Sequence, residues 1–472
     1  MKKLTRRSFL KTSALLGAST FISPRFSIAQ SGAAANSKVN LAFIGCGGNV
    51  VKGDLIAAMG ENLVALCDVN ETDLTIHAEV NPQIATAAKF RDFRVMLDKM
   101  GKEIDAVVIT TPDHTHFAAT MEAMQRGKHV LTQKPLTHNV WQARTLRKAK
   151  EKYGVITNMG NQGHMRNGIR QMREWVEAGV LGTVHEVDSW YPGPKWADPG
   201  STKPAIWRKP DSFPPGVMPI PADLDWPLWL GPVPDPGYNS VYAPRSWRGF
   251  SQFGTGMIGD WFCHICDGAV WTLDLYEPTV IEAEKIDGPN PGMCPDGSII
   301  RWDFGARGDK PPCTLRWYDG GNVPPSPAEW SWGALPKFGS FFRGSKNCVF
   351  LDERSNNPRL VNKEEMEAFK EAGFPPERFP RLQQGKPIDE WLRAIKGTGP
   401  EPGSNFDYAA RLTEVACLGA IAQFHGGRIE WDSANMKITN RPELNAFIKQ
   451  PMPAGWAYGE DLWSPNEPEG RV

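Results

Sequence analysis

The sequence predicts an α/β protein whose N-terminal part is a doubly wound parallel sheet. Apolar strand-like runs begin at Val39, Leu63, Ala106 and His129, and longer amphipathic segments separate them. A glycine-rich turn follows the first run, and an acidic residue, Asp68, ends the second. At 472 residues the chain is long enough to hold more than one hydrophobic core. We therefore expect a second domain after the parallel sheet.

Residues 1–36 are expected to be an export signal and linker. The stretch "TRRSFLK" places Arg6 and Arg7 ahead of an apolar run from Thr12 to Ile22, and "SIA" ends it with a small-x-small cleavage signal. This pattern resembles a twin-arginine (Tat) signal peptide. Because the apolar run is shorter than the ~20 residues of a spanning helix, we expect export and cleavage. The mature chain should then be periplasmic and have no membrane span.

The composition of the chain shows no excess of positive charge. The chain has 53 Lys plus Arg and 53 Asp plus Glu, and the signal carries several of the basic residues and no acid, so the mature chain is mildly acidic. No nucleic acid is expected as a partner. Of eight cysteines, several lie inside apolar runs, where a thiol behaves as a small hydrophobe, so no disulfide framework is implied.

The run "VNLAFIGCGGNV" is typical of a dinucleotide-binding turn. Gly45 permits a tight turn, and Gly47 and Gly48 let the backbone approach a pyrophosphate at a helix N-terminus. Asp68, about 20 residues on, would accept hydrogen bonds from both ribose hydroxyls, and its charge favours NAD over NADP. Val50 occupies the third glycine position of this fingerprint, so we expect looser packing of helix on strand there.

A second segment, Asp105–Asn139, strengthens this interpretation. It contains the Thr-Pro-x-x-x-His pattern of Thr111, Pro112 and His116, followed by "GKHVLTQKP". Together with the glycine turn, these motifs resemble the Gfo/Idh/MocA family of NAD(P)-dependent sugar and polyol oxidoreductases. That family has Glu-Lys-Pro where this chain has Gln133-Lys134-Pro135, which puts in doubt any function that depends on the glutamate.

The resemblance implies a domain organisation. A Rossmann domain should span 37–158, and an α+β domain with a large open sheet should span 159–440, covering the cofactor and forming a homo-oligomer. An irregular tail should follow from 441 to 472. The cofactor should be NAD. The residues expected to hold it are Gly45, Gly47, Gly48, Asp68, Thr111, Pro112, His116, Gln133, Asn161 and Gln162.

The stretch "GDWFCHICD" is the candidate catalytic segment. In a helix, Asp260, His264 and Asp267 fall on one stripe, and the resemblance implies an acid/base group of Lys134, Asp260 and His264. The residue pattern agrees, because an imidazole can titrate near neutrality and Asp260, one turn away, can orient it. A metal site and a CxxC redox pair are weaker alternatives, so no metal is expected.

The substrate expected from the resemblance is a small sugar or glycoside, bound by Lys134, His164, Arg248, Asp260 and His264. Residues 191–254 are rich in Pro, Trp and Gly and should form a loop region at the substrate pocket. Whether Trp207 and Trp247 stack on a sugar or are structural stays open.

Three functions remain at this point. The first is an NAD-dependent oxidoreductase acting on a sugar hydroxyl, and the second is an NAD-dependent glycoside hydrolase or lyase that oxidises its sugar transiently. The third is a non-catalytic sugar-binding protein. A periplasmic enzyme has no soluble NAD pool, so we expect the cofactor to be tightly bound and recycled. The sequence does not determine the sugar, the carbon or the anomer.

Overall fold

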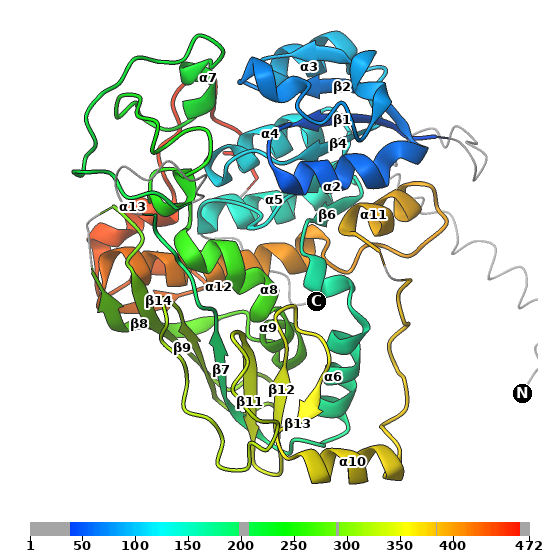
Figure 1. The fold of residues 1–472 in the computed structure, drawn as a ribbon, viewed down its shortest axis with the longest axis vertical. Coiled ribbons are helices and arrows are strands. Elements are labelled where there is room, and N and C mark those ends of the chain that lie inside the picture. The colour runs from blue at the N-terminus through cyan, green and yellow to red at the C-terminus, as the bar shows by residue number, and fades with distance from the viewer. Residues whose placement is uncertain (1–37, 198–206, 289–291, 384, 463–472) are drawn as a thin grey trace, which may run out of the picture. The chain divides into compact units, whose positions relative to one another are not determined.

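The computed structural model describes residues 38–197, 207–288, 292–383 and 385–462 (Figure 1). The expected export signal and linker lie outside these residues. From Lys38 onward the described residues form one compact unit, so the domain boundaries expected within it stay predictions. In the described part of the chain, no helix combines the length and apolarity needed to cross a membrane.

The first sheet has six strands in the order β3-β2-β1-β4-β5-β6, and every neighbouring pair is parallel. The doubly wound parallel sheet expected from the sequence is therefore confirmed. Its strands are β1 (Asn40–Ile44), β2 (Asn62–Cys67), β3 (Ala88–Phe90), β4 (Ala106–Ile109), β5 (His129–Thr132) and β6 (Thr157–Met159).

Helices cover both faces of this sheet because alternate strand residues are apolar on both sides. Leu41 and Phe43 of β1 pack in the same core cluster as α2 (Asn49–Ala57). Ala42 and Ile44 pack with α3 (Phe93–Met100), α4 (Asp113–Gln125) and α5 (Val140–Tyr153). Val50 is 47% exposed, so its side chain does not lie buried between helix and strand, and the looser packing expected there stays a prediction.

A helix from much later in the chain completes one face of the first sheet. Helix α11 (Pro387–Ile395) lies beside α2 (Figure 1) and places Ile388 and Trp391 in the core cluster of β1 and α2. The Trp391 indole donates a hydrogen bond to the Ile156 carbonyl at 3.2 Å. The N-terminal sheet therefore depends for its core on residues more than 200 positions away in the sequence.

The second sheet has nine strands in the order β13-β12-β11-β7-β10-β9-β8-β14-β15. Only β7 and β10 among its pairs in the described residues run parallel. The strands are β7 (Val184–Trp190), β8 (Pro278–Asp287), β9 (Gly297–Phe304), β10 (Cys313–Tyr318), β11 (Gly339–Gly344), β12 (Cys348–Leu351), β13 (Arg359–Leu360), β14 (Arg428–Asp432) and β15 (Lys437–Ile438).

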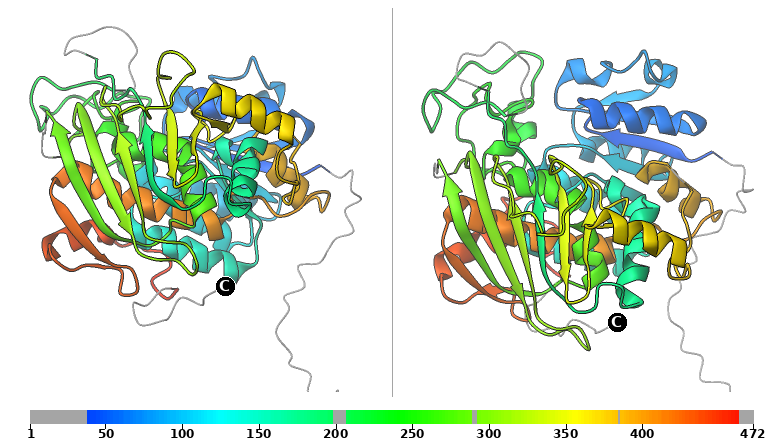
Figure 2. Two further views of the ribbon diagram at one scale, coloured as in Figure 1. Left: turned by 90° about the horizontal axis from the view of Figure 1, so that it is seen from below. Right: turned by 60° about the horizontal axis from the view of Figure 1, so that its bottom comes forward.

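Helix α12 (Phe406–His425) packs along one face of the second sheet, as both views of Figure 2 show. The Trp302 indole of β9 donates a hydrogen bond to the Val415 carbonyl of this helix at 3.0 Å. Gly419 allows the approach, because a Cβ there would lie 2.0 Å from the Trp302 ring. The remaining helices are α6 (Asn167–Glu177), α7 (Trp226–Leu230), α8 (Cys263–Ile265), α9 (Asp267–Leu273), α10 (Lys363–Ala372) and α13 (Asn445–Ile448).

Residues 191–254 are here called the insertion, and those of them that the structure describes, 191–197 and 207–254, contain little regular structure but have a core of their own. Their aromatic cluster includes Trp226, Trp229 and Phe250. His114 of α4 lies between Trp229 and Phe253, with ring centroids 4.9 and 5.3 Å away. Trp207 is 7% exposed and packs edge-on against another tryptophan, which favours the structural interpretation for this residue.

The C-terminal segment packs on the first domain's helices. The expectation that it lacks regular structure is wrong for its start, where α13 forms, and holds for most of the described residues after it. The Trp456 ring lies 6.0 Å from the Phe93 ring and 4.2 Å from the Arg94 guanidinium, both on α3.

The dependence of the first sheet on α11 leads to a testable prediction. Trp391→Ala should lower the free energy of unfolding by about 3–5 kcal/mol, because it removes a fully buried indole and leaves a cavity. Chemical denaturation followed by circular dichroism measures this. Val217→Ala, at a side chain 76% exposed, is the control and should change stability by less than about 0.5 kcal/mol. Equal losses for the two variants would contradict the role given to α11.

Candidate functional site

The glycine turn after β1 is built as expected for a backbone that must bend sharply. Gly45 has φ +85°, a left-handed conformation that favours glycine, and a Cβ there would lie 2.7 Å from the Thr110 backbone. Gly48, also at φ +85°, is the N-cap of α2, and a Cβ there would meet nothing within 4 Å. The turn therefore presents an open helix N-terminus, the arrangement that suits a phosphate.

Two carboxylates lie beside this turn. Asp68 accepts hydrogen bonds from the backbone N–H groups of Cys46 at 2.6 Å and Asn70 at 2.8 Å, and burial raises its pKa to about 6. A Cβ on Gly47 would lie 2.6 Å from an Asp73 carboxylate oxygen. A side chain at position 47 would therefore have to displace the Asp73 carboxylate, a contact that the sequence did not reveal.

The Thr-Pro-x-x-x-His pattern has two different roles. Pro112 is the N-cap of α4, and the Thr111 hydroxyl is buried with no hydrogen-bond partner among the described residues. The ring nitrogens of His116 lie 2.8 Å from the Thr111 carbonyl oxygen and 2.9 Å from that of Pro135, and burial lowers its pKa. His116 therefore connects two turns, and its expected contact with the cofactor stays a prediction.

An ion pair joins the carboxyl end of β5 to the candidate catalytic segment. The Lys134 ammonium donates to the Asp260 carboxylate and to the Asp260 backbone carbonyl, each at 2.7 Å. Asp260 also lies 3.4 Å from the guanidinium of Arg248, which itself donates to Asp113 at 3.2 Å. Burial alone would raise the pKa of Asp260, but the charges of Arg248 and Lys134 outweigh it and hold the pKa well below its usual range.

His264 lies in the same group but is neutral. Burial, together with the positive charges of Lys134 and Arg354, lowers the pKa of His264 well below its usual value. The expectation that it titrates near neutrality is therefore wrong. Its Nδ1 atom is buried and has no hydrogen-bond partner in the described residues. Asp260 pairs with Lys134 instead, so it does not orient the imidazole as expected.

The stretch "GDWFCHICD" is not a regular α-helix. Residues Ile258–Phe262 form a π-helical turn, which inserts an extra residue per turn before α8 and α9. The expected stripe is thereby divided. Asp260 meets Lys134, whereas Asp267 is fully buried. The Asp267 carboxylate lies 3.0 Å from His164 Nδ1 and accepts a hydrogen bond from the Tyr408 hydroxyl.

This division changes the role of His164. Its side chain is buried, its ring lies 4.4 Å from that of Tyr408, and Asp267 holds Nδ1. We therefore assign His164 to a buried network of the second domain. The role in substrate binding that was expected for it has no support from this geometry.

Three further residues expected to hold the cofactor, Asn161 and Gln162 after β6 and Gln133 after β5, have different surroundings. Asn161 is fully buried, and neither polar atom of its side chain has a partner among the described residues, which fits a group that awaits a ligand. The Gln162 side chain accepts a hydrogen bond from Arg354 at 3.2 Å. Gln133 donates to the Asp54 carboxylate of α2 at 2.9 Å.

Sequence reasoning missed several residues of this site. Asp113 could have been noticed, because it directly follows Thr111-Pro112 at the strand end. Arg354 gave no signal, since it lies in the turn after β12 and far in sequence from every motif. Tyr191 and Trp261 also escaped notice; their rings stack with centroids 3.9 Å apart beside Asp260 and His264.

The geometry of the described residues supports neither a redox pair of cysteines nor a metal site. All eight cysteines are free thiols, and burial raises the pKa of Cys263 to about 12. Within the described ranges, no three His, Cys, Asp or Glu side chains are grouped as metal ligands would be.

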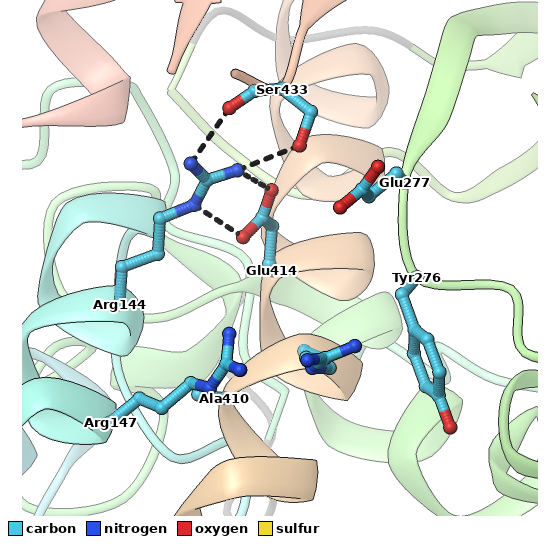
Figure 3. Close-up of a pocket in the computed structure, with 8 residues that line it drawn as sticks. Arg144, Arg147, Tyr276, Glu277, Ala410, Glu414 and Ser433 are labelled. Atoms are coloured by element: carbon cyan, nitrogen blue, oxygen red, sulfur yellow. Dashed lines mark hydrogen bonds and ion pairs between the residues drawn. The ribbon is translucent and has the colours of Figure 1, made fainter. Parts of the chain in front are cut away.

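A separate polar pocket lies between α5 and α12 (Figure 3). Its main feature is a buried bidentate ion pair between Arg144 and Glu414, with Arg144 also donating to Ser433 at 2.8 Å. It shares no residue with the group around Lys134. Its lining residues are Arg144, Arg147, Tyr276, Glu277, Ala410, Arg411, Glu414 and Ser433.

The N-terminal part of the chain is similar to known proteins. Residues 39–161 match the model of the GFO_IDH_MocA family, an oxidoreductase family with an NAD-binding Rossmann fold. The scyllo-inositol 2-dehydrogenase (NADP(+)) of Bacillus subtilis is 24% identical over 148 residues, 31% of this chain and 39% of that protein. The levoglucosan dehydrogenase of Pseudarthrobacter phenanthrenivorans is 26% identical over 139 residues, 28% of this chain and 35% of that protein. The chain thus spans less than half the length of these relatives.

Solved structures share the fold over most of the chain. The WlbA dehydrogenase of Bordetella pertussis, in complex with NADH and UDP-GlcNAcA, superposes with a TM-score of 0.54 at 16% identity, covering 84% of this chain and 99% of that one. The aldose-aldose oxidoreductase of Caulobacter crescentus, complexed with glycerol, gives 0.52 at 16% identity and covers 83% of this chain and 99% of that one. The parallel sheet followed by a large mixed sheet is therefore the fold of these oxidoreductases.

The ion pair of Asp260 leads to a prediction about stability and pH. Asp260→Asn should lower the free energy of unfolding by about 3 kcal/mol at pH 7, because it leaves Lys134 without its carboxylate and removes one of the two carboxylates that face Arg248. Since the folded pKa of Asp260 is depressed, this contribution is present above about pH 4 and is lost as the pH falls further. Urea denaturation at pH 7, 5 and 3 measures the difference. Asp98→Asn is the control, because the Asp98 side chain is 65% exposed and its ion pair with Arg126 lies at the surface. A difference that stayed constant across pH would contradict the charge assignment.

Proposed function

We propose that this protein is an NAD-dependent oxidoreductase that transfers a hydride between a hydroxyl group of a sugar or glycoside and tightly bound NAD. The observation that carries the proposal is the Lys134–Asp260 ion pair with the neutral, unpartnered His264 beside it, at the carboxyl end of β5. Ligands of open α/β sheets bind at the carboxyl ends of the strands.

The residues present fit a dinucleotide. The Gly45–Gly48 turn leaves the N-terminus of α2 open for a pyrophosphate. The orphaned polar atoms of Thr111 and Asn161, both buried, are groups that a bound ligand would satisfy. Asp68 and Asp73 lie at the expected ribose end, and two carboxylates there would repel a 2′-phosphate, which supports NAD rather than NADP.

The proton chemistry belongs to the chain's own side chains. Oxidation of a hydroxyl-bearing carbon removes a hydride and a proton, and bound NAD supplies the hydride acceptor. His264, which burial and the charges of Lys134 and Arg354 hold neutral, can take the hydroxyl proton, and Asp260 favours the positive charge that this creates. The Lys134 ammonium, fixed by Asp260, can donate a hydrogen bond to the substrate oxygen. The stacked rings of Tyr191 and Trp261 beside them offer an apolar wall of the kind that suits a sugar ring.

Contacts made by the insertion support tight retention of the cofactor. At one end, Asp225 donates its N–H to the Val69 carbonyl at 2.9 Å, one residue after Asp68, and Glu71 donates to the Asp223 carbonyl at 2.9 Å. At the other end, Arg248 binds Asp113 and Asp260. The insertion therefore connects the expected ribose end to the acid/base group, as a cover over the cofactor would.

Location and assembly complete the proposal. We place the mature protein in the periplasm on the strength of the twin-arginine pattern; since that route carries folded proteins, NAD could be exported inside the fold. We also propose a homo-oligomer formed through the second sheet. One face of that sheet carries ion pairs of Arg301, Arg316 and Arg343 with acids on neighbouring strands, a polar surface that a second copy could cover.

The cofactor is tested by analysing what the purified protein carries. Denaturation of the mature protein and mass spectrometry of the supernatant should reveal NAD and no NADP, because Asp68 and Asp73 disfavour the extra phosphate. A parallel sample of Asp73→Asn, which removes one of the two charges, should admit more NADP. Recovery of NADP from the unaltered protein, or failure to bind NAD at all, would refute this part of the proposal.

The reaction is tested with aryl glycosides in deuterated water, with and without a keto-sugar acceptor, and with NMR analysis of the products. Because trapped NAD must be re-oxidised, keto-glycoside should accumulate over many turnovers only when the acceptor is present. Lys134→Ala and His264→Ala should each reduce turnover about 10²–10⁴-fold while retaining NAD, and Cys263→Ser should keep most activity.

Two results would assign a different function to the protein. Sustained release of the aglycone without acceptor, with deuterium beside the oxidised carbon, would identify a glycoside hydrolase or lyase. No product under either condition would favour a sugar-binding protein.

A further inference from the structure

Asp54 of α2 and Gln133 at the end of β5 form a pair that neither the sequence motifs nor the acid/base group explain. The Gln133 side-chain nitrogen donates a hydrogen bond to an Asp54 carboxylate oxygen at 2.9 Å. Asp54 is 5% exposed, and Gln133 directly precedes Lys134. The pair therefore connects the helix that begins at the glycine turn to the strand end that carries the catalytic lysine.

The other end of the Gln133 amide is also fixed. A Cβ on Gly160 would lie 2.2 Å from the Gln133 oxygen, so only glycine allows the amide to lie where it does. Gly160 is itself held by a hydrogen bond from its N–H to the Thr132 carbonyl at 2.8 Å. The amide is therefore clamped between a carboxylate on one side and a backbone on the other, which leaves it one orientation.

The charges around Asp54 come from one element besides its own, helix α11. Lys386, at the N-cap of α11, binds the neighbouring Gly53 carbonyl and attracts the Asp54 carboxylate, whereas Asp389 in the first turn of α11 repels it. Gln133 contributes a neutral donor. Burial outweighs these attractions and raises the pKa of Asp54 to about 7.

We propose that Asp54 is a positioning residue that orients Gln133 beside the nicotinamide end of the cofactor site, and that the two residues are a matched pair in which only one can be a carboxylate. This inference rests on the proposed function. It accounts for the glutamine in Gln-Lys-Pro: a glutamate at 133 would place a second carboxylate within hydrogen-bond distance of Asp54, and one of the two would have to keep a proton. The one titratable group of the pair is then on the helix instead of the strand.

The test is an exchange of the two groups. Gln133→Glu alone should lower the melting temperature by about 2 °C or more at pH 8 and by less at pH 5, because the paired carboxylates bind protons more tightly when folded and stability therefore falls as pH rises. Asp54→Asn alone should lose the charge-assisted hydrogen bond. The double variant Asp54→Asn with Gln133→Glu restores one donor and one carboxylate, so it should recover most of the loss.

A second readout follows the cofactor. The NAD retained per mole of protein after purification and dialysis should fall in both single variants and return in the double variant. Gly160→Ala, which leaves both partners intact but displaces the Gln133 amide, should also reduce retention. Glu79→Gln, at an exposed ion pair on the segment after α2, is the control and should change neither measurement.

The outcomes separate this inference from the proposed function. If the unaltered protein retains no NAD, the proposed function fails, and the melting temperatures still decide whether the pair is matched. If NAD is retained but the losses of the two single variants simply add in the double variant, the pairing is overturned. A pH-independent effect of Gln133→Glu would overturn it as well.

Discussion

The ion pair between Lys134 and Asp260 is the contact on which the arrangement of the site depends. Lys134 ends a strand of the parallel sheet, and Asp260 lies in the π-helical turn beneath the second sheet, so the pair connects the two parts of the molecule at the point where ligands of this fold bind. Because both side chains are largely buried, neither charge could stay there without the other. Arg248 extends the pair to Asp113 at the start of α4, which fixes the insertion to the same point.

The charges around Lys134 and Asp260 affect the protonation state of His264. Burial and the positive charges of Lys134, Arg354 and Arg248 all disfavour a positive charge on the imidazole, so His264 is neutral. In the proposed reaction the ammonium holds and polarises the substrate oxygen. The imidazole takes the proton there, and Asp260 favours the positive charge that this creates. A carboxylate whose pKa is depressed is the condition for both.

Packing across the molecule supports the same region from several directions. Helix α11 supplies part of the core of the first sheet, the C-terminal segment lies on α3, and the insertion contacts the turn after β2 and helix α4. All three segments follow the first sheet in sequence, yet each packs against its core, its helices or its turns. The cofactor turn and the acid/base group are therefore held in one compact unit.

The sequence by itself determined what depends on near neighbours in the chain. Alternating apolar runs and a glycine turn predict the parallel sheet, and the order of motifs led to Lys134, Asp260 and His264, because strand ends and turns are local features. Only the tertiary structure decided which side chains meet. A π-helical turn sends Asp260 to Lys134 and Asp267 to the core, and burial makes His264 neutral and His116 a brace. These outcomes depend on desolvation and on partners more than 100 residues away in most cases, which no local pattern encodes.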